Sequence, residues 1–143
     1  MTKPRAILCY ITLILLVGCT DPLSIILRDN LYLEKTALEN ADAPYIGDWT
    51  TAMTAALVSI SINETGQVKI CSSNPHFGTG NGIIYREQGK IFMIFEGGDT
   101  YEFISVTEDY ILTKYFDHKY KFYSGRVPEN CRTVFNKFQG SIQ

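Results

Sequence analysis

Residues 56–62 read Ala56-Leu57-Val58-Ser59-Ile60-Ser61-Ile62, and after a turn at Glu64-Thr65-Gly66 the chain returns as Gln67-Val68-Lys69-Ile70-Cys71. Side chains of opposite character alternate along both segments, which is the period-two pattern of a half-buried β-strand. Two such segments joined by a short turn predict an antiparallel hairpin. In this hairpin Val68 and Ile70 share one face, and Cys71 lies on the other.

The chain after residue 47 repeats this plan of short strands and tight turns. After an opening strand at Gly47, the further strands are predicted at Gly82–Arg86, Ile91–Phe95, Thr100–Val106, Tyr110–Phe116 and Lys119–Ser124. Seven or eight strands in sequence order predict a mainly β protein, an antiparallel up-and-down meander. A meander of this length removes its open edges by closing into a small barrel. A flattened sandwich is the alternative.

The opening strand carries a short motif, Gly47-Asp48-Trp49-Thr50, which holds the one Trp of the chain. A Gly-x-Trp at the head of a meander, followed by a hairpin such as Ile60 to Ile70, resembles the calycins, the group of lipocalin-like and avidin-like barrels. The resemblance implies a barrel whose floor is closed by a buried Trp49. No second motif matches, so no ligand residue is carried over from that group.

The amino terminus follows a different pattern. A basic start with Lys3 and Arg5 precedes an apolar run that ends at Leu16-Val17-Gly18-Cys19. Charged, apolar and small-residue parts in this order form an export signal. The sequence resembles bacterial lipoprotein precursors, whose lipobox ends in a modified Cys. The alternatives are an ordinary secretory signal and a single membrane-spanning helix, for which the run is short.

The lipoprotein resemblance implies three steps at the Cys. These are attachment of a diacylglycerol group to the Cys19 thiol, cleavage after Gly18, and acylation of the new amino terminus, for example with palmitate. Because Thr20 rather than Asp follows the Cys, the resemblance also implies sorting to the outer membrane, although Asp21 comes one place later. Whether the domain then faces the periplasm or the cell surface stays open.

These patterns divide the chain into four parts. They are a signal peptide at 1–18, a lipidated tether at 19–46, a β-barrel domain at 47–125, and a C-terminal helix and tail at 126–143. Leucines near a helical spacing predict a weak, short N-terminal helix around 29–40 in the tether, with a hairpin about Asp29-Asn30 as the alternative. Removing 1–18 takes Lys3 and Arg5 from the 13 basic residues and leaves the 15 acidic ones, a net charge of about −4. Without a basic stripe, we expect no nucleic-acid partner.

Two cysteines remain for the folded part, because Cys9 leaves with the signal and Cys19 takes the lipid. The remaining pair, Cys71 and Cys131, lies in an oxidising compartment, which predicts one disulfide bond. Two free thiols or a Cys₂ metal site are the alternatives. Neither Cys has a CxxC or CxxH neighbour, which argues against metal.

A C-terminal helix is predicted by the recurrence of Cys131, Val134, Phe135 and Phe138 on one helical face after Pro128. If Cys71 points out of the barrel, the disulfide pins this helix packed outside the barrel. The apolar run 91–95 is the surface that we expect beneath it. A frayed tail is the alternative.

No catalytic or metal-ligating motif stands out. His76 and His118 are isolated in a loop and a turn, and there is no G-x-S-x-G sequence. The carboxylates around residues 96–109 fall in predicted turns, where solvation is their usual state. We therefore expect no enzyme, no cofactor and no metal.

Aromatic side chains crowd the late strands. With the first-strand Trp, the candidate ligand-binding residues on the inner face are Trp49, Tyr101, Phe103, Tyr120 and Phe122. They either fill a core or line a pocket. The expected function is that of an outer-membrane lipoprotein whose barrel binds a small apolar ligand. The alternative function is protein interaction, in which the barrel binds an envelope protein and acts as a hydrolase inhibitor or as an assembly accessory. The general plan of the chain is similar to that of lipid-anchored barrels that inhibit lysozyme.

Overall fold

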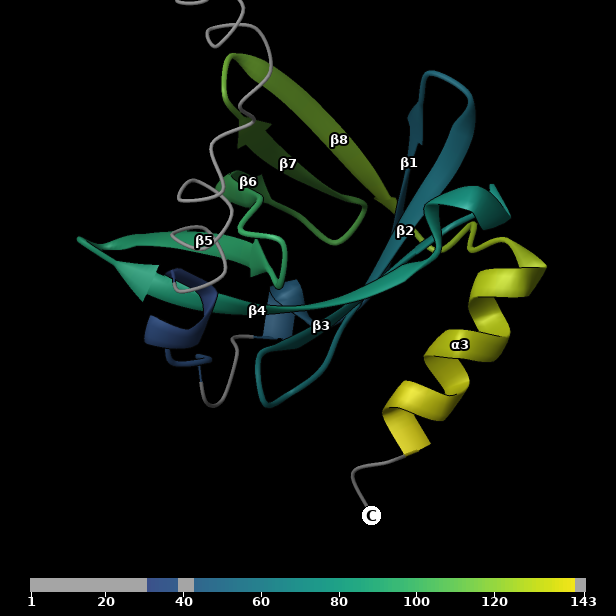
Figure 1. The fold of residues 1–143 in the computed structure, drawn as a ribbon. Helices are drawn as coiled ribbons and strands as arrows, with labels where there is room; N and C mark the ends of the chain where they lie inside the picture. The colour runs from purple at the N-terminus through teal and green to yellow at the C-terminus, as the bar shows by residue number, and fades with distance from the viewer. Residues whose placement is uncertain (1–30, 39–42, 141–143) are drawn as a thin grey trace, which may run out of the picture.

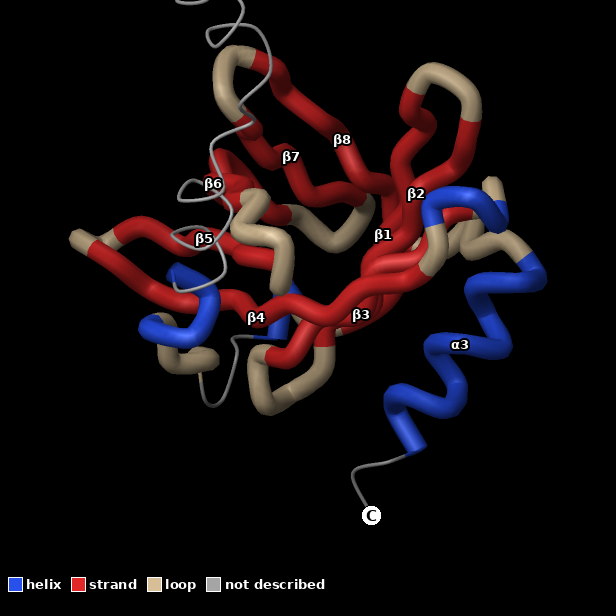
Figure 2. Tube along the Cα trace, in the orientation of Figure 1, coloured by secondary structure: helices blue, strands red, loops and turns tan. Residues whose placement is uncertain are grey.

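The computed structural model describes residues 31–38 and 43–140. The predicted signal peptide, the predicted lipidation site at Cys19, and residues 20–30 and 39–42 of the predicted tether lie outside the described residues. In the part of the chain that is described, eight antiparallel strands follow one another around a closed barrel, and one long helix lies outside it (Figures 1 and 2). The predicted up-and-down barrel with an outer C-terminal helix is confirmed, and the sandwich alternative is wrong.

The strands are short and joined by tight connections. Their bounds are β1 Gly47–Met53, β2 Ala56–Ile62, β3 Gln67–Ser72, β4 Thr79–Glu87, β5 Lys90–Phe95, β6 Thr100–Val106, β7 Tyr110–Tyr115 and β8 His118–Ser124. The short 3-10 helices η1 (Ala43–Tyr45) and η2 (Pro75–Phe77) precede β1 and follow β3, and the helix α3 spans Glu129–Gly140. His118, predicted in a turn, is therefore the first residue of β8.

Strand pleating sends alternate side chains into one barrel core. Ile60 lies opposite Trp49 on β1 and opposite Ile70 on β3, so the apolar residues of neighbouring strands meet on the same face. The buried members of the core are Trp49, Ile60, Ile62, Val68, Ile84, Ile91, Met93, Phe95, Phe103, Ile111 and Phe122. As predicted, Val68 and Ile70 face this core, and Cys71 faces away from it.

One end of the barrel is closed by aromatic packing. Trp49 is 4% exposed, and its Nε1 donates a hydrogen bond to the Tyr45 carbonyl at 3.0 Å. The Tyr45 ring meets the Phe103 ring edge-on, with 5.2 Å between centroids. Leu38 adds to this end, because its amide donates to the Ile84 carbonyl at 2.8 Å and its side chain packs on the core. Trp49 is thus buried, as predicted.

Helix α3 lies against the outside of β3 (Figure 1). Cys71 and Cys131 form the predicted disulfide bond, and the Asn130 side chain donates to the Ser72 carbonyl at 3.0 Å. The inward helix face buries Cys131 and Phe135 in a small cluster with Cys71 and Val127. The spacing of the apolar residues therefore predicted this face correctly.

The prediction that the apolar run 91–95 lies beneath helix α3 was wrong. The outward residues of β5, Phe92 and Ile94, are covered by Tyr32 and Ala37 from the N-terminal segment, not by α3. That segment is helical at 31–34 and has no regular secondary structure at 35–38, so within the described residues the predicted helix around 29–40 is shorter than expected. The physical reason is tertiary: the Leu38 amide bonds to β4 instead of continuing a helix.

The seam that closes the barrel is short. Strands β1 and β8, both entirely within the described residues, pair at two positions, Trp49 with Ser124 and Thr50 with Tyr123. The hairpin of β1 with β2 pairs along the whole of β1, from Gly47 to Met53. Toward their hairpin turns β1 and β8 diverge (Figure 1).

Candidate ligand site at the open end of the barrel

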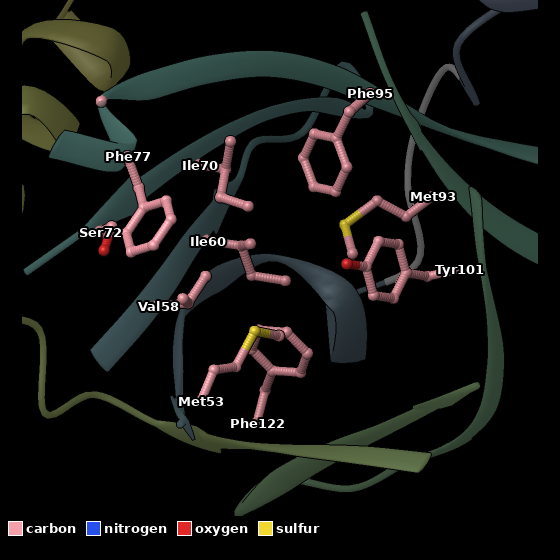
Figure 3. A pocket seen from close by; sticks show the side chains of 11 residues that line it. Met53, Val58, Ile60, Ile70, Ser72, Phe77, Met93, Phe95, Tyr101 and Phe122 are labelled. Atoms are coloured by element: carbon pink, nitrogen blue, oxygen red, sulfur yellow. The ribbon is translucent and has the colours of Figure 1, made fainter. Parts of the chain in front are cut away.

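The end of the barrel away from Trp49 contains a cavity. Connections between successive antiparallel strands alternate between the two ends of a meander, so the turns after β1, β3, β5 and β7 surround this end. The cavity has a volume of about 180 Å³. Figure 3 shows the residues that line it: Met53, Val58, Ile60, Ile70, Ser72, Phe77, Gly78, Met93, Phe95, Tyr101 and Phe122.

Two glycines on β4 shape one wall of this cavity. A Cβ on Gly80 would lie 3.0 Å from Ile70 Cγ2, and a Cβ on Gly82 would lie 2.7 Å from Phe95 Cδ1. The space that inward side chains of β4 would take is therefore occupied by Ile70 and Phe95, which lean over the strand. The opposite wall comes from Met53 and Phe122 (Figure 3).

The cavity is apolar except for two hydroxyl groups among the described side chains that line it. The Ser72 hydroxyl accepts a hydrogen bond from the Asn74 amide at 3.1 Å. The Tyr101 hydroxyl points into the space between the other side chains (Figure 3). Burial, helped by the nearby Asp99 carboxylate, raises the pKa of Tyr101 from 10.0 to about 12. The phenol therefore stays protonated at neutral pH and is available as a donor.

Other aromatic rings hold the Tyr101 ring in place. It stacks on Tyr115 with 4.7 Å between centroids, and Phe95 and Tyr120 meet it edge-on at 5.9 and 6.2 Å. The Tyr115 hydroxyl donates to Asp99 Oδ1 at 2.7 Å, which fixes that ring in turn. Such offset and edge contacts favour one ring orientation. The Tyr101 hydroxyl is therefore a preorganised group.

Two exposed aromatic residues lie in connections around the same end. Phe77, in η2 between β3 and β4, is 72% exposed although its ring also lines the cavity, and Phe116, in the turn between β7 and β8, is 73% exposed. Phe116 has a positive φ of 51°, a conformation that bulky residues rarely adopt. We call these two residues the aromatic rim.

The five predicted ligand-binding candidates separate into two groups. Tyr101 and Phe122 line the cavity. Trp49 and Phe103 belong to the packed core, and Tyr120 packs partly buried against it. Of the five candidates, then, the structure places two at the cavity and three beside or below it.

Most of the cavity wall was missed from the sequence. The inward positions Ile60, Ile70 and Met93 follow from strand alternation, but the abundance of aromatic residues drew attention to the late strands. Phe77 lies in a connection, where strand periodicity says nothing about side-chain direction. The signal available in the sequence was an aromatic residue, Phe77, directly before the Gly-rich stretch 78–82.

Two further features of the described residues concern metal binding and membrane-spanning helices. Among them, no group of three or more His, Cys, Asp or Glu side chains is placed to hold a metal ion. Within residues 31–38 and 43–140, no helix has the length and apolar character that crossing a bilayer requires.

The fold defines the class of this molecule as a small closed β-barrel with one outer helix and a cavity at one end. No family model matches the sequence, and no curated protein matches it. Among solved structures, it is similar to the lipoprotein YedD from Klebsiella pneumoniae, with a TM-score of 0.56 and 16% sequence identity over 78% of this chain and 97% of that one. At this identity, the likeness concerns the fold.

Proposed function

We propose that this protein is a non-enzymatic lipoprotein, anchored through Cys19 to the outer membrane, whose barrel binds a small apolar molecule. The observation that carries the proposal is the cavity of about 180 Å³ at the open end. Its wall is almost entirely apolar, so transfer of an apolar molecule from water into it is favourable.

The size of the cavity limits the ligand. Drug-sized ligands occupy pockets of roughly 300–1,000 Å³, whereas an engineered apolar cavity of about 150 Å³ binds benzene. The cavity here therefore suits one substituted ring or a short branched chain. A long fatty acid would not fit inside it.

The ligand proposal is tested with a matched pair of substitutions. Val58 lines the cavity, and its neighbour Leu57 is 41% exposed. We expect Val58→Trp to fill the space and Leu57→Trp to leave it open. Small molecules released by denaturing the protein from native membranes should be recovered from wild type and Leu57→Trp, and be lost from Val58→Trp. Equal recovery from both variants would contradict the proposal.

Membrane anchoring is supported by the lipobox resemblance and by the structural neighbour YedD, which is described as a lipoprotein. Each acyl CH₂ buried in the bilayer contributes about 0.8 kcal/mol, and more than one chain is needed for stable attachment. We expect Cys19→Ser to abolish incorporation of a fatty-acid probe in cells and to leave the precursor uncut. Cys9→Ser, which changes the other cysteine of the amino-terminal region, is the matched control and should label normally. Continued labelling of Cys19→Ser would exclude the lipobox.

A second candidate function is binding of an envelope protein, such as a lysozyme-type hydrolase. The aromatic rim favours it, because exposed aromatic residues are common anchors in interfaces. In a cell-wall lysis assay, a purified inhibitor would slow lysozyme, and Phe116→Ser would relieve the inhibition. Unchanged lysis with the wild-type protein would remove the lysozyme version of this candidate.

A further inference from the structure

The chemical class of the ligand is indicated by the Tyr101 hydroxyl. This hydroxyl points into the cavity (Figure 3), and within the described residues it has no hydrogen-bond partner. Because no buried side-chain nitrogen or oxygen among the described residues is left without a partner, this hydroxyl is accessible to water, and a ligand that fills the cavity takes that hydrogen bond away. A ligand that brings an acceptor oxygen to this position restores that bond.

The charge of the ligand is limited by the rest of the wall. None of the described residues that line the cavity is Lys, Arg or His, and the Asp99 carboxylate lies near Tyr101. Burying a carboxylate or phosphate without a cationic partner is strongly unfavourable. An anionic ligand is therefore disfavoured twice, by desolvation and by Asp99.

We propose that the cavity selects a neutral, ring-sized apolar molecule that carries one acceptor oxygen, such as a ketone, and that Tyr101 donates a hydrogen bond to that oxygen. This inference rests on the proposed ligand-binding function and names its ligand class. Stacking on Tyr115 and edge contacts with Phe95 and Tyr120 hold the donor in position before the ligand arrives. The phenol is protonated at neutral pH, as any donor of this bond must be.

Three probes of nearly equal shape separate the effect of an acceptor oxygen on binding from the effect of a negative charge. Acetophenone has a neutral acceptor oxygen, α-methylstyrene has a CH₂ group in its place, and benzoate is an anion. Binding of each at neutral pH is measured by ligand-observed NMR with the chain from residue 19 onward, carrying Cys19→Ser so that no attached lipid competes. We expect acetophenone and α-methylstyrene to bind, and benzoate to bind at least about a hundredfold more weakly than acetophenone.

The decisive variant is Tyr101→Phe, which keeps the ring and removes the hydroxyl. We expect the affinity for acetophenone to fall about fivefold, since one neutral hydrogen bond is lost. The affinity for α-methylstyrene should change by less than about twofold, which also shows that the cavity is intact. Tyr123→Phe makes the same change at a 44%-exposed residue outside the cavity, and both affinities should stay as in wild type.

A measurement on the wild-type chain gives an independent answer. The carbonyl carbon of ¹³C-labelled acetophenone should move downfield from its position in hexane, as in hydrogen-bonded ketones. A hexane-like position, an equal loss of both neutral probes in Tyr101→Phe, or tight benzoate binding would overturn the ligand class while leaving cavity binding intact. If none of the three probes bound to the wild-type chain, the proposed ligand-binding function itself would be overturned, and this inference with it.

Discussion

Two inward glycines of β4 differ in how much side chain they tolerate. A Cβ at position 82 would lie 2.7 Å from both the Ile94 carbonyl oxygen and the Phe95 ring, whereas at position 80 it would meet only the end of the Ile70 side chain, at 3.0 Å. Backbone cannot move aside as a methyl group can. We therefore expect Gly82→Ala to lower the free energy of unfolding by about 1–3 kcal/mol.

Gly80→Ala is the matched control for this effect. The Ile70 side chain can shift by a few tenths of an ångström, so we expect a loss well below that of Gly82→Ala. Urea unfolding of the two variants, followed by Trp49 fluorescence, gives both values. Equal losses at the two positions would mean that close backbone contact is not what selects glycine at 82.

The Tyr101 phenol makes the stability of the fold depend on alkaline pH. Its pKa is raised from 10.0 to about 12, so the folded state holds this proton more tightly than the unfolded chain does. The resulting stabilisation is complete below pH 10 and is lost as the pH rises toward 12. Wild type should therefore lose stability relative to Tyr101→Phe over that interval, by up to about 1.4 kcal/mol per pH unit. A difference that is constant with pH would contradict this.

Single residues mark how far the sequence could predict the cavity. Tyr101 and Phe122 were identified because strand alternation gives the direction of a side chain. Phe103 belonged to the same alternate set, yet it packs on Tyr45 at the closed end. The position of a side chain along the barrel axis depends on the register between neighbouring strands, and that register cannot be read from a single sequence. Phe77 was missed because a connection has no periodicity.

Among the elements, α3 depends on one covalent link. It contacts β3 through the disulfide between Cys71 and Cys131 and a small buried cluster. Replacing both cysteines with Ala should lower the free energy of unfolding by about 2–5 kcal/mol. Proteolysis should then cut within residues 129–140 more readily than in wild type. Alkylation of both thiols in the native, unreduced protein would contradict the bond.

The helices show why some elements were predictable and others were not. The helical face of α3 could be predicted, because its apolar spacing and its Cys are local properties of the sequence. The covering of Phe92 and Ile94 by residues 31–38 could not. It depends on a hydrogen bond between Leu38 and Ile84 and on an ion pair between Lys35 and Glu87 at 2.7 Å, and both join parts of the chain that are far apart in sequence.

For the whole molecule, the sequence predicted that the barrel closes, but it did not predict whether the barrel interior is filled or hollow. Consecutive strands with tight turns leave two edges, and pairing β1 with β8 removes both. Whether the interior is filled or hollow depends on the fit of individual side chains. The structure contains both conditions, with a filled end around Trp49 and a cavity at the other end.

The short seam between β1 and β8 has a consequence for local opening. Free energies of opening differ within a protein, and the segments with few backbone bonds open first. We expect the amides that bond across this seam to exchange hydrogen with a smaller opening free energy, and a weaker dependence on denaturant, than amides between β2 and β3. Uniform protection around the barrel would contradict this. If the wall parts along this line, a molecule can reach the cavity while the remaining strands stay hydrogen-bonded. The opening rate of the seam, which hydrogen exchange measures directly where reclosing is slower than exchange, then sets an upper limit on the rate of entry by this route.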